Sequence, residues 1–149
     1  MRTLHVSLFL TLMVVAVVGC AGCGDSKEQA GSACTMASQC YPLVPNPSTI
    51  HGMVVCLTQY QGGYCTHTCA ADTDCCAING ECRTGFKQVC SPFENQPTTY
   101  CFLSCEAADI AAAPNGGVTD PNAFCQRFGG PSMSCRSTGG GSANRHFCG

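Results

Sequence analysis

Cysteine is the residue type with the most chemistry to offer in this sequence. Sixteen of the 149 residues are cysteine, a share of about 11% that is typical of disulfide scaffolds. Spacing alone does not decide which cysteines pair, and each bridge typically contributes about 2–4 kcal/mol by restricting the unfolded chain. We expect seven disulfides from fourteen of them: Cys34, Cys40, Cys56, Cys65, Cys69, Cys75, Cys76, Cys82, Cys90, Cys101, Cys105, Cys125, Cys135 and Cys148.

One run of cysteines has the spacing of a known active site. Residues 75–82 read Cys-Cys-Ala-Ile-Asn-Gly-Glu-Cys, which is similar to the active-site helix of secreted phospholipases A2. In that family a catalytic histidine and a calcium-binding aspartate occupy the positions held here by Asn79 and Gly80. Neither residue can serve as a general base or as a carboxylate ligand, so we expect no such activity. For the adjacent Cys75 and Cys76 we expect two separate partners, rather than a strained ring between them.

Two aspartates and three histidines are the other candidate functional groups. Asp72 and Asp74 suit calcium, but one short cluster supplies too few oxygens, so we expect them to cap a helical turn. We expect His67 to be a surface histidine, since no nucleophile is identifiable beside it. His51 and His146 stand alone in predicted loops. No hydrolase, zinc-protease or phosphate-binding motif is present, so the sequence predicts no catalytic residue, metal site or cofactor.

The first nineteen residues read as an export signal. Arg2 supplies a positive charge, and the apolar stretch Val6–Val18 follows it. Thirteen helical residues reach about 20 Å, short of the roughly 30 Å hydrocarbon core of a bilayer, which favours a removable signal over a spanning helix. The stretch ends in Val17-Val18-Gly19-Cys20, which resembles the lipobox of bacterial lipoproteins. We therefore expect residues 1–19 to be removed and Cys20 to be lipid-modified.

Export has two consequences for the other cysteines. An oxidising compartment favours disulfides over zinc binding by reduced thiols, which is the alternative for a chain so rich in cysteine. Residues 20–33 are polar and read as a flexible tether, and this tether contains Cys23. Because lipid occupies Cys20, Cys23 is the cysteine left over. We expect it to be either a free thiol near the membrane or the site that joins two copies.

Few regular elements are expected to hold these cysteines. The apolar run Met53–Leu57 predicts a short strand. Glu106–Ala113 predicts two turns of helix, and Asp120 followed by Pro121 predicts the start of another that ends near Gly129. The expected fold is a small, disulfide-rich, loop-rich domain with short strands and one to three short helices, built as two tandem cysteine modules.

An internal repeat defines those two modules. Cys65–Asp72 aligns with Cys101–Asp109, because each begins with Cys-x3-Cys after a tyrosine. Glu81–Gly85 aligns with Ser134–Gly139, and the closing cysteines Cys90 and Cys148 then correspond. Longer loops between fixed cysteines are tolerated, since loop-closure entropy grows slowly with length. The predicted parts are an N-terminal cysteine loop at 34–61, module 1 at 62–98 with its repeat at Gly62–Cys90, and module 2 at 99–149 with its repeat at Thr99–Cys148.

The cysteine spacing from Gly62 to Cys75 resembles that of cysteine-rich lipoproteins of large-genome, gliding soil bacteria. It is also similar to small modules described as EGF-like or Dickkopf-type, and the resemblance covers about residues 31–90. These proteins have no assigned activity, so the resemblance implies a class and a location. It implies attachment to the cell envelope, at the outer rather than the inner membrane, facing an oxidising compartment.

The predicted function is a non-catalytic binding or structural module, anchored in the bilayer by lipid, with a protein or glycan partner. Nine acidic residues against seven basic ones argue against nucleic acid. One alternative is a small hydrolase inhibitor with Pro42–His51 as its reactive loop. A second is an enzyme that uses His67 with Asp72 or Asp74, and a third is a purely structural envelope component.

Overall fold

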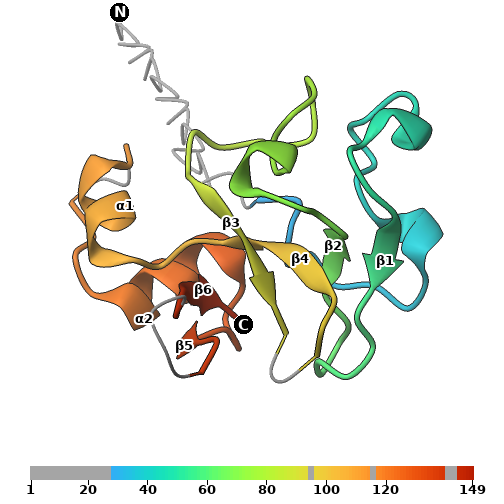
Figure 1. Cartoon of the computed structure of the whole chain (residues 1–149). Coiled ribbons are helices and arrows are strands. Elements are labelled where there is room, and N and C mark those ends of the chain that lie inside the picture. Colours follow the sequence, from blue (N-terminus) through green and yellow to red (C-terminus); the bar gives the residue numbers. More distant parts are fainter. Residues whose placement is uncertain (1–27, 94–95, 115–116, 140–143) are drawn as a thin grey trace, which may run out of the picture.

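A computed structural model describes residues 28–93, 96–114, 117–139 and 144–149. Its regular structure is sparse: short strands joined by loops, with short helices in the C-terminal third (Figure 1). The predicted small, disulfide-rich, loop-rich fold is therefore confirmed. The strands are β1 (Val54–Cys56), β2 (Cys65–His67), β3 (Gln88–Pro92), β4 (Thr99–Leu103), β5 (Cys135–Ser137) and β6 (His146–Cys148), and the α-helices are α1 (Ala107–Ala112) and α2 (Pro121–Phe124).

The local predictions for strand and helix positions are confirmed. Strand β1 lies inside the predicted run 53–57, and α1 lies inside the predicted helix 106–113. The Asp120 side chain accepts a hydrogen bond from the Ala123 amide (2.7 Å), and Pro121 occupies the first turn of α2. A π-helical turn at Cys125–Gly129 continues α2 to the predicted end. The start of α2 is thus set by the chemistry of Asp120 and Pro121 themselves.

The six strands form three separate antiparallel hairpins, β1–β2, β3–β4 and β5–β6. Each hairpin places two cysteines directly opposite each other: Cys56 and Cys65, Cys90 and Cys101, and Cys135 and Cys148. These facing cysteines are not bonded to each other. Each one is instead joined to a cysteine that precedes its hairpin in the chain, so each hairpin is tied twice to the segment before it.

All fourteen cysteines that the sequence assigns to disulfides are paired. Cys75 and Cys76 have separate partners, as expected. The seven bridges are Cys34–Cys56, Cys40–Cys65, Cys69–Cys90, Cys75–Cys101, Cys76–Cys82, Cys105–Cys135 and Cys125–Cys148.

Six of the seven bridges repeat one pattern three times. With Cys76 and Cys82 set aside, in each set of four successive cysteines the first bonds to the third and the second to the fourth, and the third and fourth face each other in a hairpin. We call these sets unit I (34–65), unit II (69–101) and unit III (105–148). The Cys-x3-Cys sequences at 65–69 and 101–105 are the links between units. The seventh bridge, Cys76–Cys82, is an addition inside unit II.

The predicted alignment of the repeat is therefore correct at its Cys-x3-Cys motif and wrong beyond it. Cys82 does not correspond to Cys135, because Cys82 belongs to the additional bridge. Cys90 corresponds to Cys135, and Cys101 corresponds to Cys148. The predicted boundaries at 62 and 99 fall inside units I and II. The additional pair Cys76–Cys82 is what shifts the sequence alignment, because Cys82-Arg83 has the same sequence as Cys135-Arg136.

Equivalent backbone contacts join neighbouring units. An isolated β-bridge pairs Thr68 with Tyr100, and another pairs Ser104 with Phe147. The cysteine that ends each link donates an equivalent backbone hydrogen bond. The Cys69 amide donates to the Thr99 carbonyl (3.2 Å), and the Cys105 amide donates to the His146 carbonyl (3.1 Å). The last strand of one unit thus continues as an edge of the next, as β2 and β4 do in Figure 1.

Aromatic side chains from all three units meet in a common core. Tyr64 of unit I lies against Phe102 in the link between units II and III, with ring centroids 5.3 Å apart, and Phe102 lies 4.3 Å from Phe147 of unit III. A second cluster is centred on unit III, where Phe124, Phe128 and Ile110 pack against Phe86 of unit II. The three units are therefore one packed body rather than separate domains.

The predicted tether at 20–33 is too long at its C-terminal end. Residues 20–27, with Cys20 and Cys23, lie outside the described residues, but Glu28, Gln29 and Ala30 are fully buried. The Glu28 carboxylate accepts hydrogen bonds from the Arg83 amide (2.8 Å) and the Thr84 amide (3.1 Å). The Gln29 side chain donates to the carbonyls of Gly80 and Glu81. Polar composition suggested a solvated segment, but these polar groups satisfy buried backbone groups of unit II.

Candidate functional site

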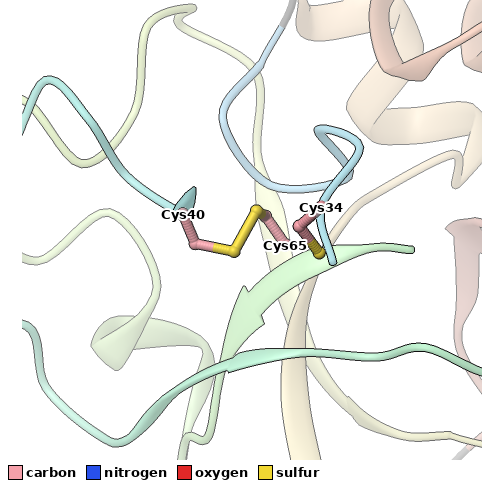
Figure 2. A group of neighbouring side chains, drawn as sticks. All are labelled: Cys34, Cys40 and Cys65. Carbon is pink, nitrogen blue, oxygen red and sulfur yellow. A yellow bond between two sulfur atoms is a disulfide. The ribbon is translucent and has the colours of Figure 1, made fainter. Parts of the chain in front are cut away.

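The cysteines serve the scaffold in each unit. The sulfur atoms of Cys34, Cys40 and Cys65 lie within 4.8 Å of one another (Figure 2), and units II and III contain equivalent groups at Cys69, Cys75 and Cys101 and at Cys105, Cys125 and Cys135. Each group is the point where the two bridges of a unit pack together. Their sulfurs are consumed in disulfides, whereas a metal needs thiolates.

His67 is buried, so the expectation of a surface histidine is wrong. Its side chain is 0% exposed, in β2 of unit I. Its Nδ1 lies 2.9 Å from the Thr68 carbonyl oxygen and its Nε2 lies 2.8 Å from Glu81 Oε1. A carbonyl only accepts, so Nδ1 carries a proton. The ring is held in place by a carboxylate that comes from unit II, fourteen positions along the chain.

Glu81 is the centre of this buried polar group. Besides His67, its carboxylate accepts hydrogen bonds from the Cys76 amide (2.6 Å) and the Ile78 amide (3.2 Å). Burial on its own raises the pKa of Glu81, but the hydrogen bonds from His67 and the two amides hold that pKa below its usual range. The ionised carboxylate thus organises the short loop closed by Cys76–Cys82. This pair has no solvent access and fastens unit I to unit II.

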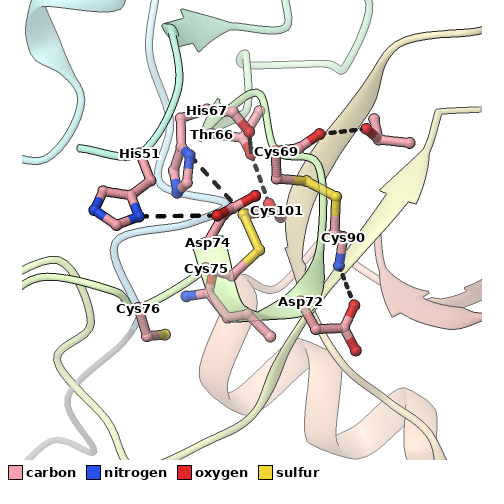
Figure 3. Close-up of a disulfide and its surroundings, with 12 residues drawn as sticks. His51, Thr66, His67, Cys69, Asp72, Asp74, Cys75, Cys76, Cys90 and Cys101 are labelled. Carbon is pink, nitrogen blue, oxygen red and sulfur yellow. Dashed lines mark hydrogen bonds and ion pairs between the residues drawn. A yellow bond between two sulfur atoms is a disulfide. The ribbon is translucent and has the colours of Figure 1, made fainter.

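Asp72 and Asp74 are engaged by other groups (Figure 3). Asp72 receives two guanidinium N–H bonds from Arg145 (both 3.1 Å) and one from the Cys90 amide (2.9 Å). Although partial burial raises it, the pKa of Asp72 is lowered by these bonds. Asp74 accepts from the Ala70 and Ala71 amides at the start of the 3₁₀ turn Asp72–Asp74. Asp74 therefore caps the turn, as predicted, whereas Asp72 braces unit II through Arg145 and the Cys90 amide and does not cap the turn.

The remaining predicted groups are two histidines and the proposed reactive loop. His51 is exposed and lies 3.8 Å from Asp74. His146 is exposed at the start of β6, so it belongs to a strand rather than to a loop. The segment Pro42–His51 is largely exposed and carries Leu43, which is 52% exposed. Its residues Pro47–Thr49 form a 3₁₀ turn capped by Asn46. The inhibitor alternative stays a prediction.

A cavity of about 400 Å³ lies where the first and third units meet. The N-terminal segment 31–33 and the hairpin connection 60–64 form one side, and residues 129–133 of unit III form the other. Two hydrogen bonds hold the sides together: the Tyr64 hydroxyl donates to the Cys148 carbonyl (3.2 Å), and the Glu28 amide donates to the Phe128 carbonyl (3.2 Å). The volume is within the range of pockets that bind small molecules.

Main-chain atoms and apolar side chains make up most of the cavity walls, together with the polar residues Ser32, Gln61 and Ser132. Tyr60 is half-buried, and its ring lies 5.0 Å from that of Tyr64. Met133 packs from the opposite side. Glycines 31, 63, 129, 130 and 149 leave main-chain atoms at the surface of the cavity. Arg136, on β5, is the charged residue of the lining.

Sequence reasoning did not single out this cavity. Arg136 entered only through the repeat alignment, and Tyr60 and Met133 were not considered as functional. Their relation depends on the contact between units I and III, which are far apart in the chain. One signal was available: an aromatic residue precedes the fourth cysteine of every unit, at Tyr64, Tyr100 and Phe147. This repeated aromatic position would have predicted that the three hairpins pack around one core.

Comparisons with protein-family models, with curated proteins and with solved structures find no match to this chain. Among the described residues, no helix is long and apolar enough to cross a bilayer.

Proposed function

We propose that this protein is a lipid-anchored, disulfide-stapled binding module of the cell envelope, without catalytic activity. The observation that carries the proposal is the cavity between units I and III, which presents one cation and apolar walls to solvent. The polar groups that chemistry would need are used differently. His67 and Glu81 are buried against each other, and Asp72 is bound by Arg145.

The proposed location is supported by the N-terminal sequence and by the bridges. The stretch Val6–Val18 followed by Gly19-Cys20 fits a lipoprotein signal, and seven disulfides suit an oxidising compartment. Glu28 is the first described residue and is already part of the folded domain. Residues 20–27 then form the tether, and the module sits close to the membrane, the outer one in preference to the inner one. The partner is a protein or a glycan.

Replacing Cys20 and Cys23 one at a time tests the anchor. In cells supplied with a palmitate analogue that can be labelled, the unaltered chain should carry the label and sediment with membranes. Cys20→Ser should lose the label and leave the membrane fraction. Cys23→Ser is the matched control three residues away, and it should keep both properties. It should also abolish any dimer seen on a non-reducing gel, if Cys23 joins two copies.

Retention of label and membrane association by Cys20→Ser would refute the lipid anchor. Finding that most of the fourteen scaffold cysteines react with a thiol reagent in the non-reduced protein would refute the disulfide-stapled module.

A further inference from the structure

Arg136 differs from the paired cations of the described chain. Lys87 lies 3.2 Å from Asp109, and Arg145 bonds to both Asp72 and Glu106. Arg136 makes no hydrogen bond and no ion pair with any residue that the structure describes, and no carboxylate side chain lines the cavity. Its guanidinium is exposed. A protein with more acidic than basic residues thus leaves a cation unneutralised at the edge of this cavity.

The strand register directs Arg136 to this place. Arg136 pairs with Phe147 across the β5–β6 hairpin, so the two side chains share one face of it. Phe147 is buried in the core common to the three units. The stem of Arg136 therefore lies beside an apolar surface while its charged end stays at the cavity.

Close packing keeps the glycine walls free of side chains. A Cβ on Gly129 would lie 2.5 Å from the Met133 sulfur, and one on Gly63 would lie 1.9 Å from the Cys34 carbonyl oxygen. Gly63 also has a φ of +74°, which side-chain-bearing residues rarely adopt. The backbone thus requires glycine at 63, whereas at 129 an added Cβ would displace the flexible Met133 side chain. Main chain, Tyr60 and Met133 form much of the remaining wall of the cavity.

We propose that this cavity binds a small ligand that carries a carboxylate, with the carboxylate on Arg136 and the uncharged part against Tyr60 and Met133. The proposal rests on the proposed binding function and names its ligand chemistry. Guanidinium and carboxylate form paired, charge-assisted hydrogen bonds. A single cation matches a monoanion. A phosphate carries about two negative charges and usually takes several donors.

Two sources could supply such a carboxylate, the C-terminus of a short peptide or an acidic sugar. Each can be tested with a pair of probes that differ in the charge. N-acetyl-alanyl-alanine is compared with its C-terminal amide, and N-acetylmuramic acid is compared with its methyl ester. We expect one acid to bind at least about tenfold more tightly than its neutral counterpart, which corresponds to about 1.4 kcal/mol, and the pair that shows the preference identifies the source.

Methionine methyl groups provide the readout. Met133 lines the cavity, whereas Met36 and Met53 are exposed elsewhere in the chain. In the full chain, purified in detergent and labelled with ¹³C at the methionine methyls, binding at the cavity should shift the Met133 signal and leave those of Met36 and Met53 in place. Met133→Leu identifies the signal by its loss.

Arg136→Gln should remove the preference for the acid while leaving the fold intact, because the side chain is exposed. Arg83→Gln is the matched control, since Arg83 is also an exposed arginine but lies outside the cavity lining. It should bind as the unaltered chain does. The Met36 and Met53 signals and the thermal transition of each variant report whether it is folded.

Four results would overturn the proposal. They are equal binding of acid and amide, a preference that survives in Arg136→Gln, a shift of Met36 or Met53 rather than Met133, and no binding by any probe. Equal binding of charged and neutral probes at Met133 would still support a binding module, so the failure of the carboxylate assignment is distinguishable from failure of the proposed function. The result of the Cys20→Ser labelling experiment, whichever way it falls, bears only on the lipid anchor and not on the ligand of the cavity.

Discussion

Units I and III have the same bridge pattern but are filled differently. In unit I five residues separate the first two cysteines, and a single 3₁₀ turn at Ala37–Gln39 occupies them. The Gln39 side chain closes this turn by accepting from the Thr35 amide (2.7 Å). In unit III the corresponding segment contains α1 and α2, which bring Ile110 and Phe124 into the interior. Three of the six buried residues in the cluster of unit I are cysteine, whereas the cluster around unit III has eight, of which three are cysteine and three are phenylalanine.

This difference shows which features of the fold the bridges determine and which they leave free. The bridges and the hairpin register fix the path of the chain, and they are the same in both units. The segment between the first two cysteines is variable, because closing a longer loop costs little entropy. A longer segment can bury apolar area of its own. We therefore expect unit III to depend on its aromatic core and unit I to depend on its bridges.

The largest expected effect is from Phe124→Ala in unit III. Phe124 is 1% exposed, and its ring lies 5.2 Å from that of Phe86 and 5.0 Å from that of Phe128. Removing a buried phenylalanine leaves a cavity and typically costs about 3–5 kcal/mol. Denaturant unfolding of the oxidised protein should show a loss in this range. A loss below about 1 kcal/mol would show that unit III does not depend on these rings.

The next effect is from removing a bridge of unit I by replacing both Cys40 and Cys65 with alanine. This bridge closes a loop of 25 positions, and the chain-entropy estimate for such a loop is about 3.5 kcal/mol. The same exchange at Cys76 and Cys82 is the control, since that loop spans 6 positions and the estimate is about 2 kcal/mol. Denaturant unfolding measures both losses, and limited proteolysis should cut the first variant within residues 41–52. Equal losses in the two variants would contradict the dependence of unit I on its bridges.

Glu81→Gln tests how unit II differs from units I and III, because a buried ionised carboxylate stabilises the interior of unit II. Loss of the carboxylate leaves buried His67 and two amides without their ionic partner, which we expect to cost about 2 kcal/mol at pH 7. The pKa of Glu81 is lowered from 4.5 by folding, so its contribution is present above that pH and is lost as pH falls through the folded-state value. Thermal unfolding at pH 7 and pH 3 should therefore show a gap between variant and unaltered chain that narrows in acid. A gap of the same size at both values would contradict an ionised Glu81.

The smallest effect is expected for Arg145→Ala, which removes the link between units II and III on the surface. Arg145 bonds to Asp72 of unit II and to Glu106 of unit III, at 3.1 and 2.7 Å. Partly exposed ion pairs contribute little, typically up to about 1 kcal/mol. Thermal unfolding in low salt should show a loss of this size that shrinks in 1 M salt, where charges are screened. A loss independent of salt would point to packing rather than charge.

Local chemistry made part of this structure predictable from sequence. The cysteine content indicated the scaffold, Asp120 with Pro121 marked the start of α2, and the apolar run at 53–57 marked β1. The scaffold followed from composition alone, and for α2 and β1 the deciding residues lie within a few positions of one another. The separate partners of Cys75 and Cys76 followed from the strain of a vicinal bridge.

The rest depended on contacts between distant positions. His67 was expected at the surface because nothing near it in the chain could satisfy it, but Glu81 reaches it from the next unit. Glu28 was expected in a tether because its partners, the Arg83 and Thr84 amides, lie more than fifty positions away. The cavity combines residues 31–33 with residues 129–136. No periodicity or spacing in the sequence predicts that these two segments lie side by side.

The fastening of Glu28 and Gln29 has a mechanical consequence. A pulling force applied through the N-terminus first meets the hydrogen bonds of these two residues to residues 80–84 and to Phe128, and so it is passed to units II and III before the first bridge of unit I is loaded. Beyond Cys34, two crossed disulfides in each unit offer a covalent path that bypasses most of the loops. Stretching can then lengthen only the short links and hairpins along that path. Under load the molecule behaves as a short chain of three closed loops, which can yield at its hydrogen bonds and regain its shape when the force is released.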